Sequence, residues 1–141
     1  MLPPEFLIHL QGPEGGPLPV DFETLAERLQ RLPRMYFEWD GSWVWTGELT
    51  VAGSPTSRRW QLDGMVYDAA GVVQYIELKG TCPWAAWQKL IAACGSFAVS
   101  DAVGNSGGFP TDAGRWTVTW VTGQELWELP RFQQTFWGGV A

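Results

Sequence analysis

Two carboxylates and a lysine near the middle of the chain have the residue types and spacing of a metal-dependent active site. Residues 60–80, WQLDGMVYDAAGVVQYIELKG, contain Asp63, Glu77 and Lys79 around the turn signal DAAG. That signal predicts a β-hairpin with a three-residue loop at 69–71, which places Asp63 directly opposite Glu77. Facing carboxylates repel each other. A lysine, an arginine, a shared proton or a divalent cation must therefore offset the repulsion, and Lys79 is predicted on the same face.

The pattern LDGMVYD…YIELKG resembles the D…(D/E)xK signature of the PD-(D/E)XK nuclease superfamily. The resemblance implies that Asp63 and Glu77 hold Mg²⁺, and that Lys79 orients or activates the attacking water. In such a site the metal lowers the pKa of water and neutralises phosphate. The implied activity is that of a Mg²⁺-dependent nuclease or phosphodiesterase, and nucleic acid would be a partner only in this case.

The resemblance also covers the order of predicted elements over residues 22–121, although its motif consists of three side chains. In the family a helix precedes three strands, and a second helix and a further strand follow. Leu62 stands where the family has a proline before the aspartate. The element order implies that an acidic residue of the first helix, Glu23 or Glu27, adds to the site.

Other reactive residue types are scarce in this chain. His9 is the only histidine, so a site with several histidine ligands is excluded, and we interpret this residue as structural. A helix between Cys82 and Cys94 would separate their Cα atoms by roughly 18 Å. That distance is too long for a disulfide. The sequence therefore predicts two free thiols.

Periodicity and turn residues predict a single α+β domain over residues 1–141. The predicted order is a strand at 5–12, a helix at 20–34, hairpins at 35–49 and 60–80, a helix at 81–95, a flexible Gly-rich loop near 95–114, a strand at 115–123, and a tail with a short helix broken at Pro130. The simplest arrangement is a two-layer sandwich, with a mostly antiparallel sheet of five to six strands and two helices on one face.

The face that the helices leave bare is predicted to be rich in aromatic rings. A two-residue loop at Asp40 and Gly41 pairs Phe37 with Val44 and directs both toward the helices. The rings predicted on the bare face are Tyr36, Trp43, Trp45, Tyr67 and Tyr75. A lone monomer rarely exposes so much apolar surface. A second copy, another protein, the tail or curling of the sheet would cover it.

Composition favours a binding protein. Ten tryptophans in 141 residues favour a recognition surface in addition to a core. The formal net charge of −6 repels phosphate and suits a basic partner. No stretch is predicted to span a membrane. The main prediction is therefore a small cytoplasmic, non-catalytic domain without a cofactor, which forms a homodimer or binds a basic protein through the bare face.

Overall fold

The computed structural model describes residues 2–50, 52–53, 55–95 and 113–138, so most of the predicted loop near 95–114 lies outside the described residues. The strands are β1 (Phe6–Gln11), β2 (Met35–Phe37), β3 (Ser42–Thr50), β4 (Ser57–Ala69), β5 (Val72–Gly80), β6 (Thr117–Trp120) and β7 (Leu126–Glu128). The helices are α1 (Phe22–Gln30), α2 (Trp84–Ala93) and α4 (Leu129–Trp137), with 3-10 turns at Pro13–Gly15 and Ala113–Arg115.

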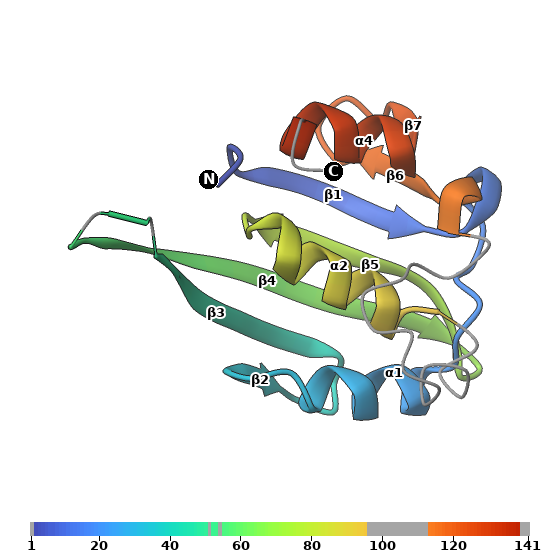
Figure 1. Cartoon of the computed structure of the whole chain (residues 1–141). Coiled ribbons are helices and arrows are strands. Elements are labelled where there is room, and N and C mark those ends of the chain that lie inside the picture. Colours follow the sequence, from blue (N-terminus) through green and yellow to red (C-terminus); the bar gives the residue numbers. More distant parts are fainter. Residues whose placement is uncertain (1, 51, 54, 96–112, 139–141) are drawn as a thin grey trace.

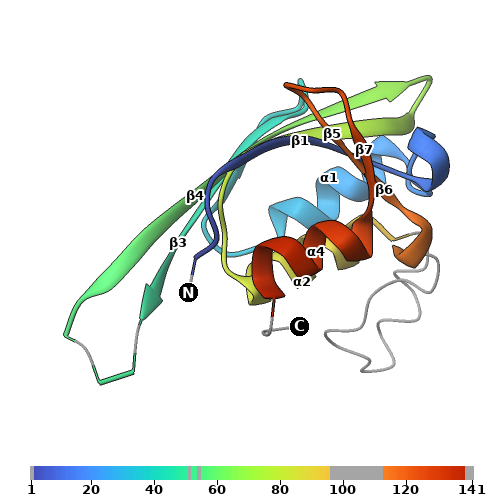
Figure 2. The same ribbon diagram turned by 90° about the horizontal axis from the view of Figure 1, so that it is seen from above.

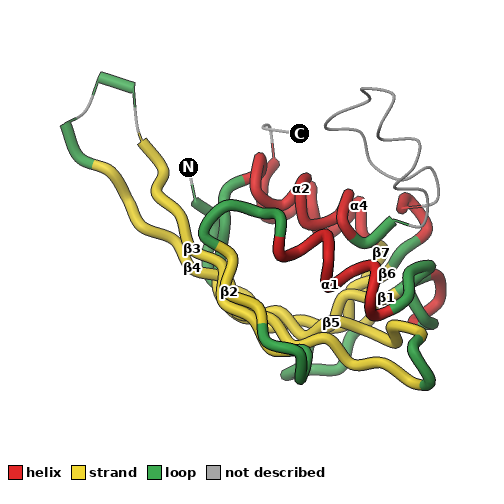
Figure 3. The backbone as a smooth tube through the Cα atoms, turned by 90° about the horizontal axis from the view of Figure 1, so that it is seen from below, coloured by secondary structure: helices red, strands yellow, loops and turns green. Residues whose placement is uncertain are grey.

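The described strands form one antiparallel sheet in the order β2-β3-β4-β5-β1-β6-β7. Although β1 comes first in the sequence, it lies inside the sheet between β5 and β6 (Figure 1). The sheet curves around α1, α2 and α4, which all lie on its concave side (Figures 2 and 3). The predicted α+β fold with an antiparallel sheet is confirmed. The described residues contain one more strand, β7, and one more packed helix, α4, than predicted.

The helix α1 is capped by Asp21 and contacts the end of α2. The backbone N–H of Thr24 donates a hydrogen bond to the Asp21 carboxylate at 3.4 Å. At the other end, the Arg28 guanidinium donates to the backbone carbonyls of Ala93 (2.8 Å) and Gly95. The last carbonyls of a helix lack partners within the helix, and a cation suits the negative end of its dipole. Arg28 therefore ties α1 to the C-terminal end of α2.

The tail forms the third helix, which begins with a proline. Pro130 lies in the first turn of α4, where a missing N–H removes no helical hydrogen bond. The prediction that Pro130 breaks this helix is therefore wrong. The ring of Phe132 in α4 contacts Phe6 of β1 (5.4 Å between centroids) and Trp87 of α2 (5.5 Å). The last helix thus completes an aromatic cluster over the middle of the sheet.

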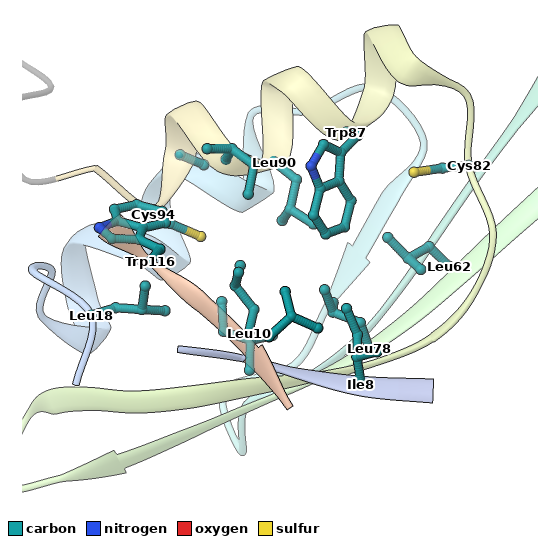
Figure 4. Close-up of a cluster of buried hydrophobic side chains, with 14 of the residues drawn as sticks. Ile8, Leu10, Leu18, Leu62, Leu78, Cys82, Trp87, Leu90, Cys94 and Trp116 are labelled. Atoms are coloured by element: carbon teal, nitrogen blue, oxygen red, sulfur yellow. The ribbon is translucent and has the colours of Figure 1, made fainter. Parts of the chain in front are cut away.

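The hydrophobic core fills the space between the concave side of the sheet and the helices. Figure 4 shows Ile8 and Leu10 of β1 below Trp87 of α2, and all three side chains are fully buried. Cys82 and Cys94 are free and buried in the same core, which confirms the predicted free thiols. Burial raises the pKa of the Cys94 thiol to about 12 and also raises that of Cys82. Neither thiol is a nucleophile near neutral pH.

Glycines opposite tryptophans allow β3 and β4 to hold large rings against the sheet. Trp43 pairs with Gly64, and Trp60 pairs with Gly47. A Cβ atom on Gly64 would lie 2.0 Å from the Trp43 ring, and one on Gly47 would lie 2.3 Å from the Trp60 ring. Each indole therefore extends over the glycine on the neighbouring strand, where any larger residue would collide with it.

Candidate functional site

The convex side of the sheet lies opposite α1, α2 and α4, and no described helix covers it (Figure 3). We refer to this side as the free face. Side chains alternate along each strand, so the positions between buried residues point to this face. They include Leu7 and His9 of β1, Val44 of β3, Asp63, Met65 and Tyr67 of β4, and Tyr75, Glu77 and Lys79 of β5.

The β4–β5 hairpin has a tighter loop than predicted and contains a bulge. Its loop consists of Ala70 and Gly71, with φ of 53° and 88°, in place of the predicted three residues. The register shifts between Tyr67 and Asp68, because Gln74 is an extra residue in β5. Together the shorter loop and the bulge move the pairing by two positions. A shift of two positions keeps each side chain on its predicted face but changes its partner.

Asp63, Glu77 and Lys79 lie on the free face as predicted, but they are paired differently. Asp63 is opposite Lys79, whereas Glu77 is opposite Met65. The prediction that Asp63 directly faces Glu77 is therefore wrong. The Gln61 amide donates a hydrogen bond to Asp63 at 2.8 Å, and no direct ion pair links Asp63 to Lys79. The register itself places opposite charges side by side, which removes the predicted repulsion.

Asp63 and Glu77 are not joined by a third acidic ligand. Glu23 and Glu27, which the family resemblance implied, lie on α1 at the other side of the sheet (Figure 2). Within the described ranges, no group of three or more histidine, cysteine, aspartate or glutamate side chains is arranged to hold a metal ion. The two carboxylates each interact with a protein neighbour, since Glu77 lies 3.1 Å from the imidazole of His9.

Trp43 and Trp45 lie in the core and not on the free face, each with 2 % of its surface exposed. The prediction that they are exposed rings is wrong because the β2–β3 loop is longer than predicted. Residues 39–41 form a three-residue loop, closed by a hydrogen bond from the Glu38 N–H to the Ser42 carbonyl at 2.9 Å. One extra loop residue shifts the pairing by one position, which turns every side chain of β3 to the opposite face.

Tyr36 and Val44 form an exposed pair near the edge of the sheet. Tyr36 lies on the free face as predicted and is 65 % exposed. Its partner across β2 and β3 is Val44, which is 36 % exposed, although it was predicted to face the helices. Because Val44 lies on the free face and Trp43 and Trp45 do not, this face is less aromatic than predicted, but it remains partly apolar.

Three aromatic side chains stand side by side at the centre of the free face. Tyr67 stacks on Tyr75 with 4.6 Å between ring centroids, and Tyr75 stacks on His9 with 4.4 Å. We call these three residues the ring row. The Nε2 atom of His9 also lies 3.1 Å from Oε2 of Glu77, an ion pair when the imidazole is protonated. Partial burial, together with the nearby Tyr67 and Glu77, raises the pKa of Tyr75 above its ordinary value.

His9 is the residue of the free face that sequence reasoning did not include in a site. Its neighbours Phe6, Ile8 and Leu10 are buried, so alternation could have placed His9 on the opposite face. Its contact with Glu77 depends on the pairing of β1 with β5. That pairing joins strands far apart in the sequence, and no local pattern indicates it.

The described free face combines exposed rings with charges of both signs. The ring row lies among Asp63, Glu77 and Lys79, with Arg59 further along β4. Rings of this kind bind by burying area at little conformational cost, and paired charges fix the orientation of the partner. The arrangement therefore suits recognition of another protein surface.

Comparisons with protein-family models, curated proteins and solved structures find no match to this chain. Among the described residues, no helix is both long and apolar enough to cross a membrane.

Proposed function

We propose that this chain is a non-catalytic interaction domain that associates with its own copy through the free face. The ring row is the observation that supports the proposal most directly. Its three side chains, with Tyr36 and Val44, form a partly apolar surface that no described element covers. Burying such a surface against another protein is favourable, and tyrosine is enriched at the centres of interfaces.

The charges of the free face favour a second copy over a basic partner. On this face Glu48, Asp63 and Glu77 are interleaved with Lys79 and Arg59, so it carries charges of both signs, although the whole chain has a net charge of −6. A two-fold axis brings the same patch of both copies together. When the charges of the patch are interleaved, the acidic residues of one copy can lie against the basic residues of the other.

Sedimentation velocity of the full chain tests self-association. We expect the wild-type chain to dimerise with rising concentration. Tyr67→Ser should weaken the dimer because it removes an outer ring of the ring row. Trp39→Ser is the matched control, since Trp39 is 61 % exposed but packs against Phe22 of α1 on the helix side. A wild-type monomer at every concentration, or equal weakening by both variants, would contradict the proposal.

Charge reversal gives a second test of the same interface. Lys79→Glu removes a positive charge from the free face and adds a negative one, so two copies should repel, and more strongly at low salt than at high salt. Lys89→Glu changes the net charge of the chain equally, but Lys89 is on α2 at the helix side. The proposal requires that only Lys79→Glu promotes dissociation, with circular dichroism verifying that both variants fold.

A Mg²⁺-dependent phosphodiesterase is the second candidate, favoured by the shared face of Asp63, Glu77 and Lys79 on adjacent strands. The test follows the NMR signals of His9 while Mn²⁺ is added, because a paramagnetic ion bound at Glu77 would broaden them. Broadening that is absent in Glu77→Gln and reversed by excess Mg²⁺ would support this candidate. No broadening at millimolar metal would reject it.

A further inference from the structure

The outer edge of β3 has no partner strand beyond residue 45 among the described residues. β2 pairs only with Trp43–Trp45, while Thr46–Thr50 pair with β4 on their other side (Figure 1). Such an edge leaves backbone N–H and C=O groups available to a further strand. Proteins often block an edge with lysine, proline or a bulge. The segment TGELT contains neither lysine nor proline, its register with β4 is regular, and its one charged side chain, Glu48, lies opposite Arg59 on the neighbouring strand.

An apolar groove of about 440 Å³ borders this edge on the helix side. Trp45, Leu49 and Trp60 form the sheet side of the groove, and Ala86 and Lys89 of α2 lie across from them. The rings of Trp45 and Trp60 make a T-shaped contact at 5.2 Å and are 2 % and 8 % exposed. The Trp45 and Trp60 side chains are therefore ordered before any ligand binds, which lowers the entropic cost of binding.

A second hollow of about 400 Å³ borders the same edge on the free-face side. Arg34 and Arg59 line it together with Glu5, and Arg34 also borders the apolar groove. Neither arginine forms an ion pair with a carboxylate in the described part of the chain. Guanidinium groups bind carboxylates through paired, charge-assisted hydrogen bonds. The hollow therefore favours a ligand with acidic side chains.

We propose that the β3 edge binds an extended segment of a partner protein in which apolar and acidic residues alternate. Successive side chains of a strand point to opposite faces. The apolar side chains of the added strand therefore enter the apolar groove, while its acidic side chains contact Arg34 and Arg59. Backbone hydrogen bonds to Thr46–Thr50 supply the remaining affinity. Arg59 borders both surfaces, but this site uses the edge of the sheet, whereas self-association uses the ring row and Lys79.

The test uses the full chain and a short fluorescent peptide of alternating valine and glutamate, with binding followed by anisotropy. We expect saturable binding that is lost when the peptide nitrogens are methylated, because methylation removes the backbone donors. A peptide with lysine in place of glutamate should not bind. Absence of binding at millimolar peptide, or equal binding of the methylated peptide, would overturn the proposal.

Charge variants then locate the peptide. Arg34→Glu should weaken binding about tenfold, whereas Arg31→Glu, exposed outside both hollows, should change it by less than about twofold. Lys89→Glu gives a second variant at the groove in case Arg34→Glu does not fold. Equal losses in Arg31→Glu and in a groove variant would indicate unspecific attraction and overturn the site.

Two further outcomes separate this proposal from self-association. Lys79→Glu, which addresses the dimer, should leave peptide binding unchanged, so the two proposals can fail independently. If the peptide instead dissociates a dimer, a second copy occupies the β3 edge, and the assignment to a partner protein is overturned.

Discussion

Trp43 and Gly64 face each other across β3 and β4, and the indole extends over the glycine. Trp60 and Gly47 repeat the arrangement four residues further along the hairpin. Since glycine has no Cβ atom, each ring can lie close to the neighbouring backbone and still be buried. The tryptophan content of this hairpin therefore serves packing, although the sequence composition favoured a recognition surface for such rings.

Gly64→Ala should lower the free energy of unfolding by about 1–3 kcal/mol, because the new methyl group overpacks the core against the Trp43 ring. Gly47→Ala should have a smaller effect, since Trp60 is 8 % exposed and can move outward. Gly114→Ala is the control, because no atom lies within 4 Å of a Cβ atom at that position. Urea denaturation gives the three values. Equal stability of Gly64→Ala and the control would contradict the packing.

The ring row makes a prediction about pH. Burial, Tyr67 and Glu77 raise the pKa of Tyr75, so the folded chain holds this proton more tightly than the unfolded chain. The stabilisation is present in full below the unfolded pKa of about 10 and is lost as the pH rises through the folded pKa. Glu77→Gln removes one of the three causes and should lower the pKa of Tyr75.

The absorbance of tyrosinate, taken as the difference between each chain and its Tyr75→Phe version, measures this pKa directly. Glu48→Gln is the control, because Glu48 lies on β3 opposite Arg59 and away from the ring row. A Tyr75 pKa that is equally lowered by Glu48→Gln would mean that net charge, and not the contact with Glu77, causes the shift.

At the scale of elements, two hairpin loops decide which residues reach the free face. In the β2–β3 hairpin the predicted two-residue loop has three residues, with Gly41 at a φ of 101°. In the β4–β5 hairpin the predicted three-residue loop has two residues, followed by a bulge at Gln74. A glycine with positive φ suits both loop lengths, so the sequence does not distinguish them.

The Ala70–Gly71 loop can be tested by stability. Ala70 has a φ of 53°, a left-handed conformation that is unfavourable for alanine and better tolerated by asparagine. Ala70→Asn should therefore raise the free energy of unfolding by about 0.5–1 kcal/mol. Ala69→Asn lies at the end of β4 and should give no gain. A loss of stability in Ala70→Asn would indicate that the loop is not at these two residues.

Local periodicity predicted the elements better than their pairing. Alternation placed Tyr36, Tyr67, Tyr75 and the acidic pair on the free face. For the β4–β5 hairpin this holds because the shorter loop and the bulge each shift the pairing by one position, and a total shift of two keeps every side chain on its predicted face. It failed for Trp43 and Trp45, because one loop residue changes the parity of the whole strand. The order of strands, with β1 between β5 and β6, depends on long-range contacts that no local pattern reports.

At the scale of the whole molecule, the two ends of the described chain close the same core. β1 is the first strand and lies inside the sheet, while α4 is the last helix and packs over it. Phe132 of α4 lies at this junction, with ring contacts to Phe6, Trp87 and Trp120 at 5.4, 5.5 and 5.8 Å. Folding of β1 and docking of the tail should therefore be coupled.

Phe132→Ala should lower the free energy of unfolding by about 3–5 kcal/mol, since it opens a cavity among rings from three other elements. Thr135→Ala is the matched control, because Thr135 lies in the same helix but is exposed. Hydrogen exchange distinguishes coupling from a local effect, because loss of the α4 contact should also speed exchange of the β1 amides in the middle of the sheet. Unchanged protection of β1 in Phe132→Ala would show that the tail packs on a sheet that is already stable without it.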